Sequence, residues 1–257
     1  MRRAIGAVVA IALAYVGVCV LVFAIQRSLI YYPQPSSLGE RDTTIALPAA
    51  DAHVVASVRQ RPGANAVVYF GGNAEDVTQS IAGLAAAFPA HALYLLHYRG
   101  YGASGGKPSE AAIVADALAL FDVAQRDHAR IDVVGRSLGS GVAVQVASAR
   151  PAARLVLVTP YDSLLAIAAS RFPYLPVSWL LRDRFESDRH AAAITAPTLV
   201  IAAARDEVIP RASTERLLAR FRPGVATLRV VAGDHNSVSE QPEYGPILGG
   251  SPGLERR

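Results

Sequence analysis

The sequence predicts a three-layer α/β fold with a mostly parallel eight-stranded sheet and helices on both of its faces. Two observations lead to this fold class. Apolar runs of strand length alternate with helical patterns along the chain, and the central runs are apolar at nearly every position. Continuous apolar strands are typical of parallel sheets that helices cover on both sides. A chain of 257 residues is long enough for one such domain.

The expected elements follow one another in βαβ order. Strands are expected at Thr43–Leu47, Val54–Arg59, Ala66–Phe70, Ala92–His97, Ile131–Val134, Leu155–Thr159, Thr198–Ala203 and Ala226–Val231. Helices are expected at Val77–Phe88, Ser109–Arg126, Leu138–Ala149 and Ala212–Arg220. The domain is therefore predicted to occupy residues 43–240.

Two segments lie outside this alternation. Between Pro160 and His190 no strand fits, so the apolar insertion at about residues 161–190 is predicted to form a small lid over the carboxyl edge of the sheet. From Gly245 onward the chain is rich in Gly and Pro, and residues 241–257 are predicted to be a loose tail.

The N-terminal segment is predicted to be a membrane anchor. Ala4 to Ile25 contains no charged residue, and about 22 residues at about 1.5 Å each can cross a hydrocarbon core of about 30 Å. Residues 1–27 are therefore expected to span a membrane, and residues 28–42 to form a linker. The alternative is a signal peptide cleaved at Ala24, which would make the protein secreted, but the apolar region exceeds the usual length of roughly 7 to 15 residues.

The charges that flank this segment predict its orientation. Arg2 and Arg3 precede it together with the α-amino group, and only Arg27 follows closely. Positive charge favours the cytoplasmic side, so the N-terminus is expected in the cytoplasm and the domain on the outer, periplasmic or extracytoplasmic side.

The composition argues against nucleic-acid binding and against a metal site. The net charge is +4, but the arginines alternate with acidic residues and form no basic stripe, which argues against nucleic-acid binding. The single Cys19 lies in the apolar segment, and the histidines other than His235 show no metal-ligand spacing, so no metal site is expected.

A candidate nucleophile follows the fifth expected strand. Gly135-Arg136-Ser137-Leu138-Gly139 places a serine where a strand must turn sharply into a helix. Such a turn exposes the Ser137 Oγ and aims the amide of Leu138 at an oxyanion on the substrate. By itself, the pattern fits an ordinary strand-to-helix turn equally well.

A candidate acid and a candidate base follow two later strands. Asp206 comes after Thr198–Ala203, and His235 comes after the last strand. The carboxyl ends of parallel strands meet at one edge of the sheet, so both are expected near Ser137. Asp206 could instead cap a helix, and Glu207 and Asp234 are alternatives for the acid. The order serine, acid, histidine favours Ser137, Asp206 and His235 as a triad.

A second oxyanion donor is expected after the third strand. Phe70-Gly71-Gly72-Asn73-Ala74 can turn its amides inward, and the amide of Asn73 is the expected partner of Leu138. An ordinary Gly-Gly turn or a phosphate-binding loop is the alternative, although no G-K-[ST] or G-x-G-x-x-G motif follows.

With these residues in place, the chain resembles the α/β-hydrolase superfamily. Within it, the chain is similar to membrane-anchored, short-lidded serine hydrolases related to the bud-emergence-type and depalmitoylating hydrolases. The matching stretches include Leu29–Pro33, Tyr69–Ala74, Tyr98–Ser109, Val134–Gly139, the Asp206 loop and His235-Asn236. The resemblance implies that Ser137, Asp206 and His235 are nucleophile, acid and base, and that no cofactor is needed. Two positions depart from it, because relatives commonly have histidine at Gly71 and aspartate at His97.

The expected function is that of a metal-independent serine hydrolase, which cleaves an ester or a thioester through an acyl-enzyme. The anchor and the apolar lid with Trp179 favour a lipophilic acyl substrate. Two alternatives stay open: a serine aminopeptidase-like peptidase, and a non-catalytic, membrane-tethered scaffold of the same fold.

Overall fold

The computed structural model describes residues 1–37, 43–49 and 51–250. Its eight strands form one sheet in the order β1-β2-β4-β3-β5-β6-β7-β8. The strands are β1 Thr43–Leu47, β2 Val54–Arg59, β3 Asn65–Phe70, β4 Ala92–Leu96, β5 Arg130–Arg136, β6 Arg154–Val158, β7 Thr198–Ala203 and β8 Ala226–Val231. β2 runs antiparallel to both of its neighbours and every other pair is parallel. The predicted mostly parallel eight-stranded sheet is confirmed, although His97 and Thr159 lie just beyond their strands.

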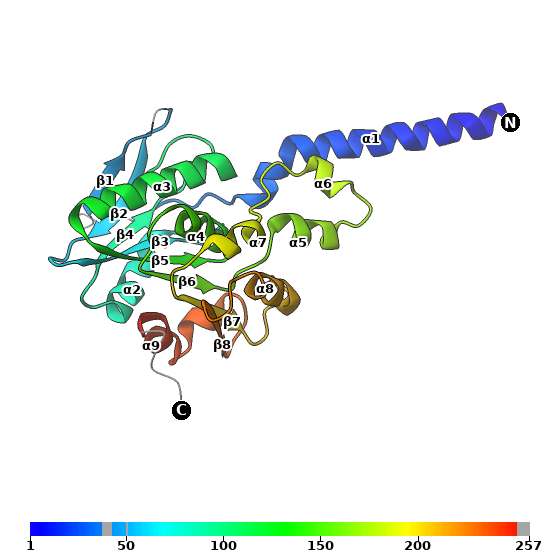
Figure 1. Ribbon diagram of the computed structural model, residues 1–257. Helices are drawn as coiled ribbons and strands as arrows, with labels where there is room; N and C mark the ends of the chain where they lie inside the picture. The colour runs from blue at the N-terminus through cyan, green and yellow to red at the C-terminus, as the bar shows by residue number, and fades with distance from the viewer. Residues whose placement is uncertain (38–42, 50, 251–257) are drawn as a thin grey trace.

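Helices cover both faces of the sheet (Figure 1). On β3, Val68 packs with the apolar side chains of α3 (Glu110–Asp127), α4 (Leu138–Ala149) and α8 (Arg211–Leu218). Its neighbour Val67 points to the other face, where α2 (Ile81–Ala87) and α9 (Tyr244–Gly249) pack. Successive side chains of a strand point to opposite faces, so fully apolar strands require helices on both sides. The predicted helix at Val77–Phe88 begins as the 3₁₀ turn η1 (Val77–Ser80) and continues as α2.

The prediction of a loose C-terminal tail is wrong for α9. This helix follows the 3₁₀ turn η3 (Ser237–Glu240) and packs on α2, with Leu248 buried. Gly249 lies so close to α2 that a Cβ atom there would overlap the main-chain oxygen of Ala87. Gly249 therefore permits a close contact between the two helices, although glycine in this part of the sequence led to the prediction of a loose tail. Residues 251–257 lie outside the described part of the chain.

The N-terminal helix α1 (Arg2–Ile30) extends away from the body of the molecule (Figure 1). It is long and apolar enough to cross a membrane, and its most apolar stretch is not buried against the body. It continues three residues beyond the predicted anchor, and residues 31–37 of the predicted linker follow in extended or irregular form. The rest of that linker, residues 38–42, lies outside the described part.

The predicted insertion between β6 and β7 forms three short helices, α5 (Leu164–Arg171), α6 (Val177–Leu180) and α7 (Ser187–His190), and a 3₁₀ turn, η2 (Ala191–Ala193). The segment that holds α5 and α6, residues 164–181, is called the lid below. The lid lies alongside α1 (Figure 1). The insertion thus joins the N-terminal helix to the body.

Candidate active site

Ser137 stands in a sharp turn between β5 and α4. Its backbone has φ 50° and ψ −118°, a conformation that non-glycine residues rarely adopt. A Cβ atom at Gly135 would overlap the main-chain oxygen of Gly139, and one at Gly139 would overlap that of Phe70. Both glycines of the motif are therefore needed to bring the strand and helix together around Ser137.

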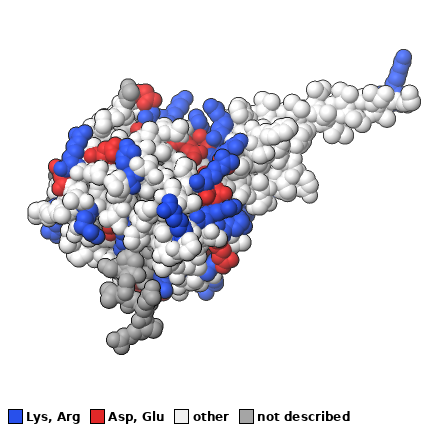
Figure 2. All heavy atoms as spheres, viewed as in Figure 1, with Lys and Arg blue, Asp and Glu red and all other residues white. Residues whose placement is uncertain are grey.

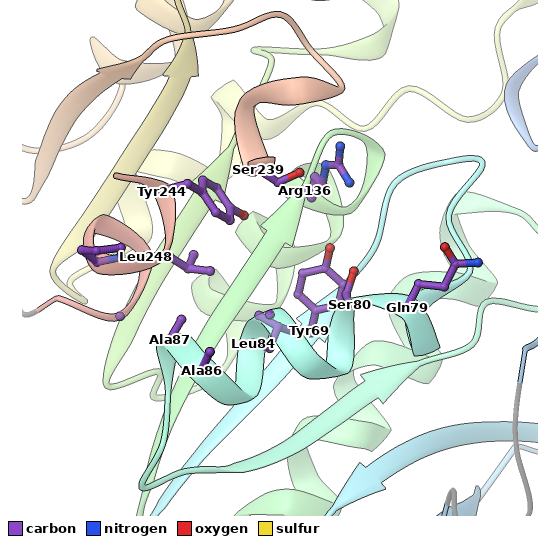
Figure 3. Close-up of a pocket in the computed structure, with 14 residues that line it drawn as sticks. Tyr69, Gln79, Ser80, Leu84, Ala86, Ala87, Arg136, Ser239, Tyr244 and Leu248 are labelled. Atoms are coloured by element: carbon purple, nitrogen blue, oxygen red, sulfur yellow. The ribbon is translucent and has the colours of Figure 1, made fainter. Parts of the chain in front are cut away.

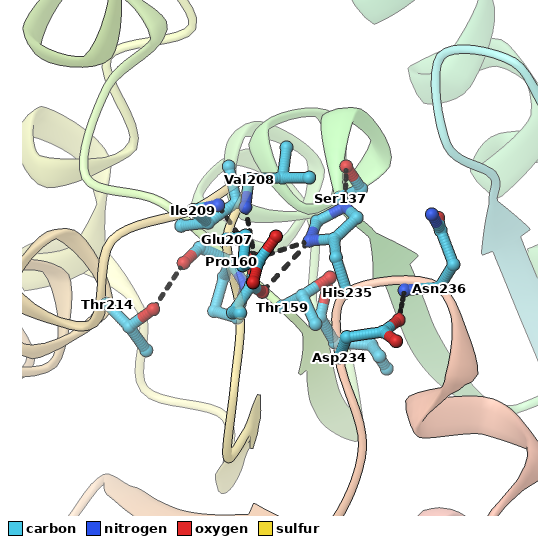
Figure 4. Close-up of polar contacts among 12 residues, drawn as sticks. Ser137, Thr159, Pro160, Glu207, Val208, Ile209, Thr214, Asp234, His235 and Asn236 are labelled. Carbon is cyan, nitrogen blue, oxygen red and sulfur yellow. Dashed lines mark hydrogen bonds and ion pairs between the residues drawn. The ribbon is translucent and has the colours of Figure 1, made fainter.

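The structure brings together the three side chains that the sequence singled out as nucleophile, acid and base (Figure 4). The Oγ of Ser137 lies 2.9 Å from Nε2 of His235, whose Nδ1 lies 2.9 and 3.0 Å from the two carboxylate oxygens of Asp206. The amides of Val208 and Ile209 donate to the same carboxylate and fix its position. With a proton on Nδ1, Nε2 can accept the hydrogen of the serine hydroxyl.

The two alternative acids do not occupy this position. The carboxylate of Asp234 accepts hydrogen bonds from the amides of Asn236 and Ser237, which fold its loop (Figure 4). These amide hydrogen bonds hold the pKa of Asp234 below its usual value. Glu207 is exposed, and its main-chain oxygen accepts from Arg171. Asp206 is thus the carboxylate at the imidazole ring.

The two expected oxyanion donors border the same site. Leu138 is the first residue of α4, so its amide lies at the positive end of that helix. Asn73 lines one cleft with Ser137 and His235, and this cleft has a volume of about 410 Å³. The preceding amide, that of Gly72, is already engaged because it donates to Glu75 Oε2 over 2.8 Å.

Two tyrosines that had no predicted role hold the loop that contains Asn73. The Tyr98 hydroxyl donates to the main-chain oxygen of Gly71 over 2.9 Å, and the Tyr101 hydroxyl donates to that of Asn73 over 2.5 Å. The Tyr101 hydroxyl also accepts the amide of Tyr32, just after α1. Both tyrosines belong to the Tyr-Arg-Gly-Tyr-Gly stretch. The sequence signal was therefore visible, but only the folded loops show what the hydroxyl groups contact.

Glu75 is a further residue that sequence reasoning missed. Besides the amide of Gly72, its carboxylate accepts the hydroxyl groups of Tyr69 and Ser80, each over 2.7 Å. Arg136, next to the nucleophile, has a nitrogen 3.7 Å from Glu75 and donates to the main-chain oxygen of Asn236 over 3.2 Å. Glu75 and Arg136 thereby connect the loop of Asn73, the nucleophile turn and the histidine loop.

The structure explains the two departures from the family pattern. A Cβ atom at Gly71 would lie only 2.7 Å from Cγ1 of Val77, so a histidine has no room there. The buried His97 has its Nε2 2.8 Å from Ser57 Oγ, and its ring packs where a Cβ atom on Gly102 would lie. Burial lowers the pKa of His97, so the ring is held in its neutral form.

A second cavity, of about 560 Å³, lies between α2 and α9 (Figure 3). Arg136, Gln79 and Ser80 border both this cavity and the cleft, whereas Ser137 and His235 line only the cleft. The larger cavity therefore adjoins the candidate site without containing it. Within the described residues, no group of three or more His, Cys, Asp or Glu side chains could hold a metal ion.

The chain is similar in sequence to known proteins over much of its length. The chain matches no protein-family model. It is 37% identical over 235 residues to the uncharacterized protein Rv2307c of Mycobacterium tuberculosis, which covers 84% of this chain and 83% of that protein. It is 34% identical over 151 residues to the α/β hydrolase domain-containing protein aho-3 of Caenorhabditis elegans, over 57% of this chain and 44% of that protein.

Solved structures share the fold at low sequence identity. The Pyrococcus furiosus esterase Pf2001 has a TM-score of 0.68 at 15% identity, over 86% of this chain and 96% of that chain. An α/β hydrolase from Vibrio vulnificus has a TM-score of 0.63 at 17% identity, over 78% and 77% of the two chains. Its sheet order and these solved structures show that the chain has the α/β-hydrolase fold, and over 57% of its length it is similar to a protein named for an α/β hydrolase domain.

Proposed function

We propose that this protein is a metal-independent serine hydrolase that cleaves an ester or a thioester through a covalent acyl-enzyme. The observation that carries the proposal is the hydrogen-bonded series from Ser137 Oγ through the His235 ring to the Asp206 carboxylate, beside the cleft. An alcohol is a weak nucleophile near neutral pH, and an oriented imidazole base removes that limitation.

Each residue has a role in this mechanism. Nε2 of His235 takes the Ser137 proton as Oγ attacks the substrate carbonyl, and the Asp206 carboxylate stabilises the imidazolium. The amides of Leu138 and Asn73 bind the oxyanion, and each such donor contributes about 2.7–4 kcal/mol to transition-state stabilisation. The imidazolium then protonates the leaving alcohol or thiol. Water, activated by the same ring, releases the acid and restores Ser137.

A covalent probe tests the nucleophile. A fluorophosphonate should label the full-length protein in detergent, and Ser137→Ala or His235→Ala should lose labelling and reduce turnover by about 10⁶-fold. Ser170→Ala, at an exposed serine of α5, serves as the matched control and should label normally. A folded wild-type protein that does not react would favour a non-catalytic scaffold.

A substrate panel tests the bond that is cleaved. Acyl esters and acyl thioesters should be hydrolysed faster than aminoacyl amides, as in the depalmitoylating branch that the chain resembles. Turnover of aminoacyl amides alone would instead identify a serine aminopeptidase-like peptidase.

The same proposal includes an uncleaved anchor, with the N-terminus in the cytoplasm and the domain outside. Its support is the length and apolar character of α1 and the placement of Arg2 and Arg3 before the apolar segment. Of two reporters fused after Arg257, one that functions outside the cytoplasm should be active, and one that functions in the cytoplasm should be inactive. Reporter activity in the cytoplasm would overturn this topology, and release of the domain into the medium would indicate cleavage.

A further inference from the structure

An apolar groove of about 210 Å³ lies between the last turns of α1 and the lid. Its lining is almost entirely aliphatic and aromatic and consists of Val22, Gln26, Leu29, Ile30, Leu164, Ile167, Ala168, Arg171, Phe172, Leu175, Val177, Leu180 and Leu181. Gln26, one of the two polar residues, has its amide engaged by main-chain groups of Phe23, Leu180 and Arg182. The groove thus offers little hydrogen bonding to a polar ligand such as a sugar or a peptide.

Polar contacts join the end of α1 to the chain just after the lid. Arg27, in the last turn of α1, donates to both carboxylate oxygens of Asp183 over 2.9 and 3.2 Å. The Tyr31 hydroxyl donates to the same carboxylate over 3.2 Å, and Asp183 is buried. A buried carboxylate needs such partners, so Asp183 fixes the chain after the lid to the end of α1, and the hydrogen bond from Gln26 to Leu180 fixes the lid itself.

The tip of the lid lies beside the apolar part of α1. The Tyr15 hydroxyl donates to the main-chain oxygen of Tyr174 over 2.8 Å. Tyr15 precedes Ile25 by ten residues, or about 15 Å of helix. A bilayer that surrounds Ala4–Ile25 therefore also reaches Tyr174.

The surface of the lid tip suits such an environment. Residues 172–181 carry no charge, and Phe172, Tyr174 and Trp179 are 56%, 88% and 85% exposed. Figure 2 shows a protrusion without charged side chains except at its far end, whereas basic and acidic side chains lie together where it joins the body. An exposed apolar tip that carries aromatic side chains is typical of a surface that enters a membrane interface.

The inner end of the groove adjoins the catalytic cleft. Ile30 lines the groove, and its main-chain oxygen accepts the side-chain amide of Asn73 over 3.0 Å. Asn73 in turn lines the cleft with Ser137. The contact between Ile30 and Asn73 therefore brings the inner end of the groove next to the cleft that holds Ser137.

We propose that this groove binds an acyl chain of a bilayer lipid and presents its ester carbonyl to Ser137. The inference rests on the proposed hydrolase function and adds the substrate class and its route of entry. A linear hydrocarbon matches the lining, and a bilayer around α1, as proposed above, would supply such chains beside the groove.

Two neighbouring alanines of α5 give a matched test of the groove. Ala168 lines it, whereas Ala169 is exposed and does not. Ala168→Phe should lower the ratio of hexadecanoyl-ester to butyryl-ester turnover by about tenfold or more, since small steric changes in an apolar pocket alter kcat/KM by about 10- to 200-fold. Ala169→Phe should leave the ratio unchanged. An unchanged ratio in Ala168→Phe, or an equal fall of the ratio in both variants, would overturn the proposal that the groove binds the acyl chain.

A second measurement does not depend on catalysis. Trp179 is the single tryptophan of the chain, so its fluorescence reports the lid tip alone. In vesicles of phosphatidylcholine brominated on its acyl chains, Trp179 emission should be quenched in both the wild type and Ser137→Ala. If the brominated lipids do not quench Trp179 emission, the proposal that the acyl chain enters from the bilayer is overturned. If Trp179 is quenched but neither ester is cleaved and no fluorophosphonate labels the protein, the hydrolase function fails instead.

Discussion

At the scale of single residues, the choice between Asp206 and Asp234 has a direct consequence. Asp206 contacts the imidazole at 2.9 Å, whereas the Asp234 carboxylate accepts the main-chain amides of Asn236 and Ser237 in its own loop. Asp206→Asn should lower kcat by about 10⁴-fold, because an amide favours the wrong tautomer of His235. Asp234→Asn should retain most of the activity. Steady-state kinetics on a butyryl ester measure both, and a larger loss in Asp234→Asn would contradict the assignment.

The same residues show what could be read from the sequence. Asp206 and His235 follow parallel strands, and the ends of such strands meet at one edge, so chain order alone placed them near Ser137. Glu75 and Tyr101 could not be found in this way. Glu75 contacts Arg136 and Tyr101 contacts Asn73 across loops that are distant in sequence, and no periodicity or spacing encodes which side chain reaches which partner.

At the scale of elements, two helical glycines should respond in opposite directions to the same substitution. Gly139 in α4 lies against the main chain of Phe70, which cannot move aside, so Gly139→Ala should destabilise the fold by about 1–3 kcal/mol or more. Gly83 in α2 has open space around its Cα, and Gly83→Ala should stabilise by about 0.5–1 kcal/mol. Chemical denaturation measures both. Equal effects would contradict the close contact between β3 and α4.

Periodicity predicted the long elements and failed for the short ones. The helices that flank the central strands have apolar faces long enough to be recognised, as in α3. α9 contains Gly245 and Pro246, which read as loop residues, and it exists because Leu248 packs against α2. Tertiary contact thus outweighs local preference where an element is only six residues long.

At the scale of the whole molecule, two histidines with lowered pKa values, His91 and His97, couple stability to pH. The ring of His97 is buried beside Ser57, and burial lowers its pKa from the ordinary 6.5, although the charge of Asp76 acts in the opposite direction. Burial also lowers the pKa of His91. The unfolded chain therefore binds more protons than the folded protein as the pH falls below about 6.5, and the free energy of unfolding should decrease there.

Carboxylates that are paired with arginine contribute to the pH dependence of stability only at more acidic pH than the histidines do. The pKa of Asp122 is lowered from 3.8 by its hydrogen bonds with Arg150, so its contribution is lost only at lower pH. Between about pH 7 and pH 5, the midpoint of thermal unfolding in detergent should fall with pH in the wild type. His97→Asn can keep a hydrogen bond to Ser57 but does not titrate, so this slope should be shallower in the variant. An identical slope in both proteins, or a flat wild-type profile, would show that the buried imidazole of His97 does not couple protonation to folding.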